Sequence, residues 1–275
     1  MDVRVTSDAA AFEQTVFPFL QQDPVLHTII MTNVHERANG SARVEAGPSY
    51  FVSVHDGDVI GAAMRTPERG VYLGALREDL AELVADAYAD VLPELSGVAG
   101  DRPAAIRFAS RWCERRGGQA TETKGTRLHK LGTLTPLEAD AGHPRPMKAD
   151  EVDQVSTWGN DGFREELRTG YREWAERQLQ HQTMWIWEVD GEAVSMVGYH
   201  LPIFGVCRVG PVYTPPEHRR HGYAGALTSH VSAEILAQGN QACLYTDLAN
   251  PTSNKIYHQT GYRPVADFVD VEFTA

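Results

Sequence analysis

The chain has 275 residues, 42% of them hydrophobic, and a formal net charge of −12, which is the composition of a folded globular protein. No apolar run approaches the ~20 residues that a membrane helix needs, and the first residues lack the basic-then-apolar pattern of a secretory signal. The negative charge argues against a general nucleic-acid-binding protein, which needs a basic face. Cys113, Cys207 and Cys243 are widely spaced and form no CxxC pair, so we expect reduced thiols, a cytoplasmic protein and no metal site.

Two stretches far apart in the chain share the pattern strand, Asp-Gly turn, strand. They are FVSVHDGDVIGAAM (51–64) and IWEVDGEAVSMVGY (186–199). Asp-Gly between apolar runs predicts a β-hairpin, because Gly adopts the positive φ of a tight turn. Each hairpin precedes a second shared pattern, a capping Asp or Asn followed by Pro and helical spacing, at 100–112 and 249–262. The order of these repeats predicts a duplicated chain, although Asp-Gly hairpins are common enough to match by chance.

A run containing Pro and Gly, from about 136 to 146, is the predicted linker between the two copies. We expect domains at 1–135 and 144–275. The second copy is longer than the first between its hairpin and its cap, and the extra length coincides with PPEHRRHGYAGAL (215–227). The first copy has no counterpart of this segment, so any chemistry is expected in the second copy.

This segment joins a Val-rich predicted strand (205–213) to an amphipathic helix. The first N–H groups of a helix lack partners, and the positive end of its dipole faces the loop. The small residues Gly222, Ala224 and Gly225 would let an anion approach those groups, while the neighbouring arginines would bind phosphate oxygens. The pattern predicts a pyrophosphate-binding loop. The alternative is that the small residues only permit close packing and the arginines are solvated.

A second motif follows in QACLYTDLANPTSNKIYHQTGY (241–262). It predicts a buried strand and then a short helix with Asn250 as N-cap, Pro251 as first residue and Gly261 as terminator. Tyr257 lies on this helix. An aromatic residue on an amphipathic helix is usually a core residue, so its functional reading depends on the motif around it.

The two motifs together resemble the GNAT superfamily of acyl-CoA-dependent N-acyltransferases. Arg219-x-x-Gly222-x-Ala224 matches the Arg/Gln-x-x-Gly-x-Gly/Ala signature of that family, and the Asn250 to Tyr262 stretch matches its later Asn…Tyr…Gly-Tyr pattern. The resemblance covers about 144–275. It implies a mixed α/β (α+β) fold with two GNAT-like domains, each a twisted, mostly antiparallel sheet flanked by helices. The N-terminal domain is the degenerate one, since it lacks the loop and has Phe108 in the place of Tyr257. This tandem layout is similar to that of the mycothiol synthases.

The resemblance also implies a site. The Tyr at position 257 would be the general acid that protonates the leaving thiolate. The general base is open, with Glu165, Glu166, Glu188 and His200 as candidates, and a solvated helix face explains the first two equally well. Backbone groups of an opened strand would hold the pantetheine amides. The candidate coenzyme-binding residues are Val212, Tyr213, Thr214, Arg219, Arg220, His221, Gly222, Tyr223, Ala224, Gly225, Asn250 and Ser253.

The implied reaction is direct transfer of an acetyl group from acetyl-CoA to a primary amine of a small molecule. Acetyl-CoA would be a co-substrate, and no metal, nucleic acid or membrane is expected to take part. One alternative is a non-catalytic acyl-CoA-binding sensor or scaffold. Another is a protein-lysine acetyltransferase, which would need an exposed groove for a peptide. A homodimer is left open.

Overall fold

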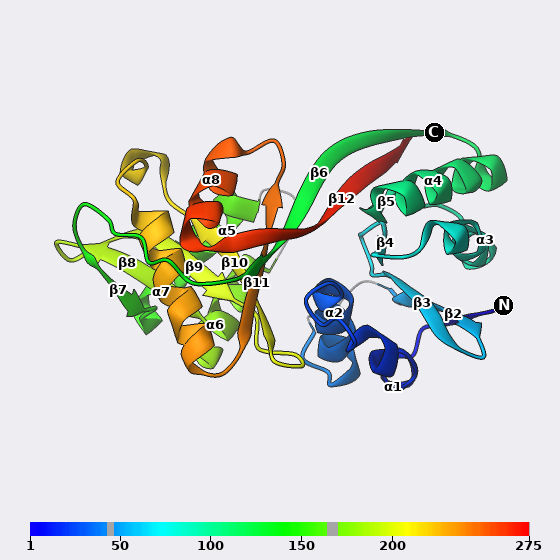
Figure 1. The fold of residues 1–275 in the computed structure, drawn as a ribbon, viewed down its shortest axis with the longest axis horizontal. Helices are drawn as coiled ribbons and strands as arrows, with labels where there is room; N and C mark the ends of the chain where they lie inside the picture. Colours follow the sequence, from blue (N-terminus) through cyan, green and yellow to red (C-terminus); the bar gives the residue numbers. More distant parts are fainter. Residues whose placement is uncertain (43–46, 164–169, 275) are drawn as a thin grey trace. The chain divides into compact units, whose positions relative to one another are not determined.

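The computed structural model describes residues 1–42, 47–163 and 170–274 (Figure 1). The chain divides into two compact units. The N-terminal unit contains Met1–Leu128, Asp247–Ala249 and Val265–Ala275. The C-terminal unit contains His129–Thr246 and Asn250–Pro264. No helix in these described ranges is both long and apolar enough to span a membrane.

Both halves of the chain have the same order of elements: a strand, two helices, three strands, a helix, a strand, a helix and a strand (Figure 1). In the first half these are β1 (Asp2–Thr6), α1 (Ala9–Leu20), α2 (Thr28–Ala38), β2 (Tyr50–Asp56), β3 (Asp58–Arg65), β4 (Val71–Gly74), α3 (Ala81–Val91), β5 (Gly97–Asp101), α4 (Arg102–Arg116) and β6 (Gln119–Leu131). In the second half they are β7 (His143–Pro146), α5 (Val152–Phe163), α6 (Tyr171–His181), β8 (Met184–Val189), β9 (Glu192–Tyr199), β10 (Val206–Tyr213), α7 (Tyr223–Ala237), β11 (Gln241–Asp247), α8 (Pro251–Thr260) and β12 (Tyr262–Thr274). Short 3-10 turns precede α3, α5 and α7 at η1 (Glu78–Leu80), η2 (Ala149–Glu151) and η3 (Pro216–His218).

The two predicted hairpins are present. Strand β2 pairs antiparallel with β3, and β8 pairs antiparallel with β9. Gly57 and Gly191 in the turns have φ values of 77° and 85°. A residue with a Cβ is disfavoured at such angles, which is why Asp-Gly between two apolar runs predicted these turns.

Helices pack on the strands of each unit. The strand order is β1-β2-β3-β4-β5-β12 in the N-terminal unit and β11-β10-β9-β8-β7 in the C-terminal unit, and β6 is divided between the units after Leu128. Most neighbouring strands are antiparallel, whereas β4 with β5 and β10 with β11 are parallel. The mixed α/β architecture expected from the sequence is confirmed.

In the N-terminal unit, the strand next to the parallel pair β4 and β5 comes from the far end of the chain. In β12, Phe268 to Glu272 pair with Asp101 to Gly97 of β5, and Val269 and Val271 are buried in the core of the N-terminal unit. The predicted domains, 1–135 and 144–275, assign the whole of β12 to the second domain and do not include its pairing with β5. Pairing between strands so distant in sequence leaves no local signal in either segment.

The C-terminal unit has a core on each face of its sheet. Leu227 and Val231 of α7 pack in one cluster with Val197 of β9, and α7 contacts β8, β9 and β10. Trp158 of α5 packs in the other cluster, with Ile186. Neighbouring side chains on a strand point to opposite faces.

Strand β8 shows this alternation directly. Trp187 belongs to the cluster under α7, whereas Ile186 belongs to the cluster under α5 and α6. Strand β8 is therefore buried on both faces.

Candidate functional site

Strand β10 leaves its parallel neighbour β11 before either strand ends. The pairing runs from Val206 opposite Gln241 to Val209 opposite Leu244 and is not continued by the described residues after Val209. The antiparallel pairing of β10 with β9 is also irregular there, with a register shift between Val209 and Val212. Pro211 lies in this stretch and has no N–H group to donate to a ladder. The sheet therefore opens between β10 and β11 close to Val212.

The segment after β10 is the predicted loop, and it leads directly into α7. Helix α7 begins at Tyr223 with Gly222 as its N-cap at φ 81°. Residues 219–222 are exposed, whereas Tyr223 is buried and Ala224 is partly buried. The first N–H groups of α7 have no intrahelical acceptor, and the helix dipole adds positive potential there. Arg220, exposed beside them, makes no hydrogen bond or ion pair with the described residues.

Two loop side chains hold the loop in place. Arg219 Nε donates to the carbonyl oxygen of Thr214 at 2.9 Å. His221 Nδ1 lies 3.1 Å from a carboxylate oxygen of Asp140, whose own N–H donates to the carbonyl of His221 at 3.2 Å. These contacts use one nitrogen of the Arg219 guanidinium and leave its terminal nitrogens for a ligand.

Asp140 belongs to a segment that sequence analysis treated only as a linker. This segment, residues 137–142, packs within the C-terminal unit against the start of α7. A Cβ on Gly222 would lie 3.0 Å from the carbonyl oxygen of Glu138, and a Cβ on Gly225 would lie 3.1 Å from Cδ1 of Leu137. Leu137 N–H donates to Ser229 Oγ at 3.1 Å.

The linker segment 137–142 therefore forms one wall of the loop. Gly225 is buried between Leu137 and Ile256, so at this position the packing explanation for a small residue is the better one. Gly222 is exposed and close to the segment, so there the absence of a side chain serves both packing and access. The Pro- and Gly-bearing composition indicated a turn-rich connection but contained no signal of these contacts.

Helix α8 has the ends that the sequence predicted. Asn250 is its N-cap and accepts the N–H of Ser253 at 3.1 Å, Pro251 is its first residue, and Gly261 ends it at φ 109°. Tyr257 is 8% exposed and lies in the same core cluster as Val209 and Leu244, the last paired residues of β10 and β11. Burial raises the pKa of Tyr257 to about 12.

The end of β10 is also tied to α5, a contact that the sequence reading missed. The ring of Tyr213 lies 6.1 Å from that of Trp158. Burial is the largest cause of the raised pKa of Tyr213, and the Asp161 carboxylate adds to it. On the other side, Ser195 Oγ donates to the carbonyl of Tyr213 at 3.0 Å and lies 2.8 Å from Thr214 Oγ1.

The four candidate general bases lie in different environments. Glu165 and Glu166 lie outside the described residues. Glu188 accepts a hydrogen bond from Arg145, which is the largest cause of its lowered pKa. His200 Nε2 lies 3.0 Å from Nη2 of an arginine on β10, and burial lowers the pKa of His200 well below its usual value. Among the residues that the structure describes, no cluster of His, Cys, Asp and Glu side chains is arranged to hold a metal ion.

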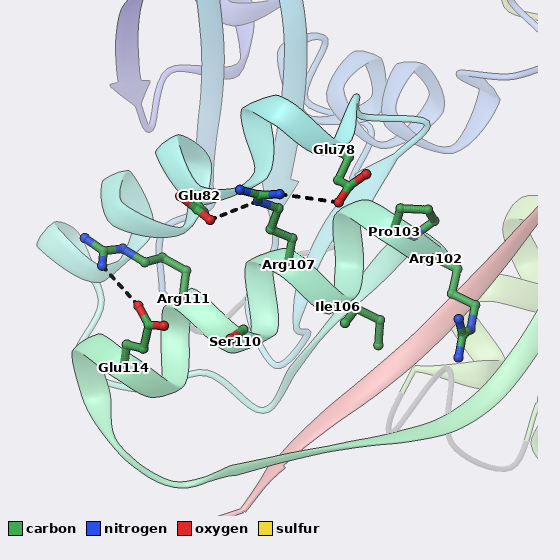
Figure 2. Close-up of a pocket in the computed structure, with 9 residues that line it drawn as sticks. All are labelled: Glu78, Glu82, Arg102, Pro103, Ile106, Arg107, Ser110, Arg111 and Glu114. Atoms are coloured by element: carbon green, nitrogen blue, oxygen red, sulfur yellow. Dashed lines mark hydrogen bonds and ion pairs between the residues drawn. The ribbon is translucent and has the colours of Figure 1, made fainter.

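The N-terminal unit differs from the C-terminal unit at the start of α3, the helix that corresponds to α7 in the order of elements (Figure 2). Acidic residues Glu78 and Glu82 lie at the start of α3, where they oppose the binding of an anion. Arg107 of α4 donates to both carboxylates, at 3.5 and 2.9 Å, across a surface groove of about 470 Å³. Phe108, the counterpart of Tyr257, is fully buried and has no hydroxyl. The features that suit an anion in the C-terminal unit are thus replaced in the N-terminal unit by internal ion pairs.

Comparison with solved structures defines the class of fold. An acetyltransferase from the GNAT family from Colwellia psychrerythraea superposes with a TM-score of 0.64 at 11% identity, covering 100% of both chains. A GCN5-related N-acetyltransferase from Sphaerobacter thermophilus has a TM-score of 0.64 at 14% identity, covering 99% of this chain and 95% of that one. A tandem GNAT protein from the clavulanic acid biosynthesis pathway has a TM-score of 0.57 at 12% identity, covering 99% of this chain and 98% of that one.

The chain therefore has the fold of the GNAT superfamily. Within that fold, residues 189–269 match the family model described as FR47-like protein. The matched part includes the opening between β10 and β11, the loop before α7, and α8. No curated protein has a significant sequence match to the chain.

Proposed function

We propose that this protein is an N-acetyltransferase that moves an acetyl group from acetyl-CoA directly to a primary amine of a small molecule. The observation that carries the proposal is the opening between β10 and β11 immediately before an exposed, arginine-bearing helix N-terminus. An opening between strands accommodates an extended pantetheine arm, and the helix N-terminus at its end suits a pyrophosphate.

Three parts of the site would hold the coenzyme. The pyrophosphate is assigned to the loop and first turn of α7, from Arg219 through Tyr223 to Ala224, with Arg220, which has no partner among the described residues, as a cation that can bind it. The pantetheine amides are assigned to the free edge of β10 at Val212 and Tyr213 and to Thr214. Asn250 and Ser253 at the start of α8 would lie along the arm. The carbonyl oxygens of Tyr213 and Thr214 already accept hydrogen bonds within the protein, so the coenzyme bonds there are assigned to N–H groups.

The chemistry requires two proton transfers. The neutral amine attacks the thioester carbon, the C–N bond forms and the C–S bond breaks, and the amine loses a proton to a base. The departing thiolate takes a proton from Tyr257, which burial keeps protonated. The same burial raises the basicity of a thiolate formed beside it, so the difference between the two pKa values controls the transfer. The base is not assigned to a residue, because the lone pair of His200 Nε2 and the Glu188 carboxylate already accept hydrogen bonds.

The proposal is tested first by thermal unfolding with and without acetyl-CoA, with free pyrophosphate as a control. Ligand at ~100 times its dissociation constant should stabilise the protein by about 2.7 kcal/mol. Arg220→Gln should reduce this stabilisation, because one charge-assisted contact to phosphate is lost. No stabilisation by acetyl-CoA would overturn the proposal. Stabilisation without turnover of any small-molecule or peptide amine would favour the non-catalytic sensor, and turnover of peptides alone would favour a protein-lysine acetyltransferase.

A further inference from the structure

Arg208 on β10 is an arginine whose charge the described residues do not balance. Its side chain is partly buried, and its Nη1 is enclosed without a hydrogen-bond partner. Its Nη2 donates to His200 Nε2 at 3.0 Å. A guanidinium has five N–H donors and no acceptor, so an enclosed Nη1 without a partner forfeits hydrogen bonds that water would supply.

His200 does not supply the missing negative charge. Because a guanidinium only donates, Nε2 of His200 must present its lone pair, and the neutral ring then carries its proton on Nδ1. Burial, and secondly the Arg208 charge, lower the pKa of His200 well below its usual value. The pair therefore carries one net positive charge near neutral pH.

A second arginine of the same unit, Arg145, shows how a largely buried positive charge is usually compensated. Arg145, 14% exposed, forms ion pairs with Glu151 and Glu188, which are 12% and 15% exposed. Burying a charge without a partner is strongly unfavourable, whereas an ion pair with satisfied hydrogen bonds offsets most of that cost. Arg145 has two carboxylate partners, whereas Arg208 has, among the described residues, only a neutral imidazole.

The position of Arg208 relates it to the proposed reaction. It lies two residues before Gly210, next to the last residue of β10 that pairs with β11. Cys207 and Val209 point to the face under α7, so Arg208 points to the opposite face, where α5 and α6 pack. It is therefore on the strand that borders the opening, on the face away from α7.

We propose that Arg208, oriented by His200, binds a carboxylate of the acceptor, so that the substrate is a small amine that also carries a carboxylate group. The inference rests on the proposed acetyl transfer. A carboxylate matches the planar fork of the guanidinium, and its single negative charge matches the single uncompensated positive charge. A phosphate monoester would bring about one charge more than the pair balances.

The test compares ω-amino acids of four to six carbons with n-alkylamines of equal length, at saturating acetyl-CoA. The wild type should have a kcat/KM at least about tenfold higher for the amino acid of each pair, mainly through a lower KM. Arg208→Gln should reduce that ratio to near one. Arg208→Lys, which keeps the charge but not the fork, should give an intermediate ratio. The control is Arg145→Gln, which breaks ion pairs in the same unit and should lower stability while keeping the ratio.

The stabilisation by acetyl-CoA, measured on every variant, separates the possible failures. A wild type that binds acetyl-CoA and acetylates both members of each pair equally would overturn the inference and leave the proposed function intact. A preference that survives in Arg208→Gln would also overturn it. Loss of acetyl-CoA binding in the wild type would instead overturn the proposed function. If Arg208→Gln does not fold, the ratio in Arg208→Lys decides, because an unchanged ratio there contradicts recognition by the fork.

Discussion

Two buried tyrosines close to each other have different hydroxyl environments. The rings of Tyr257 and Tyr262 lie 6.1 Å apart, edge to face. The hydroxyl of Tyr262 lies 2.7 Å from Ser232 Oγ, whereas the Tyr257 hydroxyl has no hydrogen-bond partner among the described residues. Burial raises the pKa of both groups. The Tyr257 hydroxyl, whose hydrogen-bonding capacity the described residues do not use, is therefore the one proposed to protonate the leaving thiolate.

Tyr257→Phe should lower kcat by about 10²- to 10⁴-fold, the usual contribution of a general acid, and keep the stabilisation by acetyl-CoA. Tyr262→Phe is the matched control. It should cost roughly 1 kcal/mol of stability, because Ser232 loses its partner, and it should leave kcat near that of the wild type. Steady-state kinetics and thermal unfolding of both variants give these values. Equal kcat in Tyr257→Phe and the wild type would remove Tyr257 from the mechanism.

At the scale of elements, the loop, α7 and the linker segment 137–142 form one assembly. Asp140 of the linker segment contacts the His221 ring, and Arg219 of the loop donates a hydrogen bond to the carbonyl of Thr214. The loop is therefore positioned before a ligand arrives, which reduces the conformational entropy lost on binding. A substitution that displaces the linker segment should affect coenzyme binding without touching the coenzyme.

Gly222→Ala tests this coupling, with Gly239→Ala as its control. The two glycines have φ values of 81° and 79°, so Ala should cost each about 1 kcal/mol of stability. Only at position 222 would the new Cβ push on the linker, 3.0 Å from Glu138 O; at Gly239 nothing lies within 4 Å. Acetyl-CoA should bind Gly222→Ala more weakly by roughly 1 kcal/mol, or about fivefold, and Gly239→Ala normally. Equal affinities in titration calorimetry would show that the linker does not position the loop.

At the scale of the whole molecule, the chain repeats one order of elements and exchanges strands near its ends. The last strand, β12, contributes Val269 and Val271 to the core of the N-terminal unit. That unit therefore depends on residues at the opposite end of the sequence. At the start of α3 it has acidic residues and Arg107 ion pairs in the place of the exposed, arginine-bearing helix N-terminus of the C-terminal unit.

Val271→Ala should destabilise the N-terminal unit by about 2 kcal/mol, because the side chain is 2% exposed and its removal leaves a cavity. Val265→Ala, at a position on the same strand that is 41% exposed, should change stability by no more than about 0.5 kcal/mol. Native-state hydrogen exchange should show the loss for Val271→Ala at the amides of β5, its pairing partner. Unchanged protection of β5 would contradict the pairing.

Local chemistry explains which features the sequence predicted correctly. Asp-Gly turns, the Asn250 cap, the Gly261 terminator and the strand–loop–helix order around Arg219 all depend on residues a few positions apart. Their geometry follows from φ preferences and from the partners of helix-end N–H groups. The mixed α/β class was implied by the resemblance of these motifs to the GNAT superfamily.

Contacts between residues distant in sequence were decided only by the tertiary structure. Three such contacts are the pairing of β12 with β5, the packing of the linker segment against Gly222 and the contact of Asp140 with His221. In each case, neither segment has a local sequence pattern that predicts the other as its partner. The unbalanced charge of Arg208 is also of this kind, because whether a charge has a partner depends on which side chains the fold brings within hydrogen-bond distance. The sequence by itself determined the elements and the Arg219-to-Ala224 motif between β10 and α7, and the tertiary structure decided which surfaces and charges surround them.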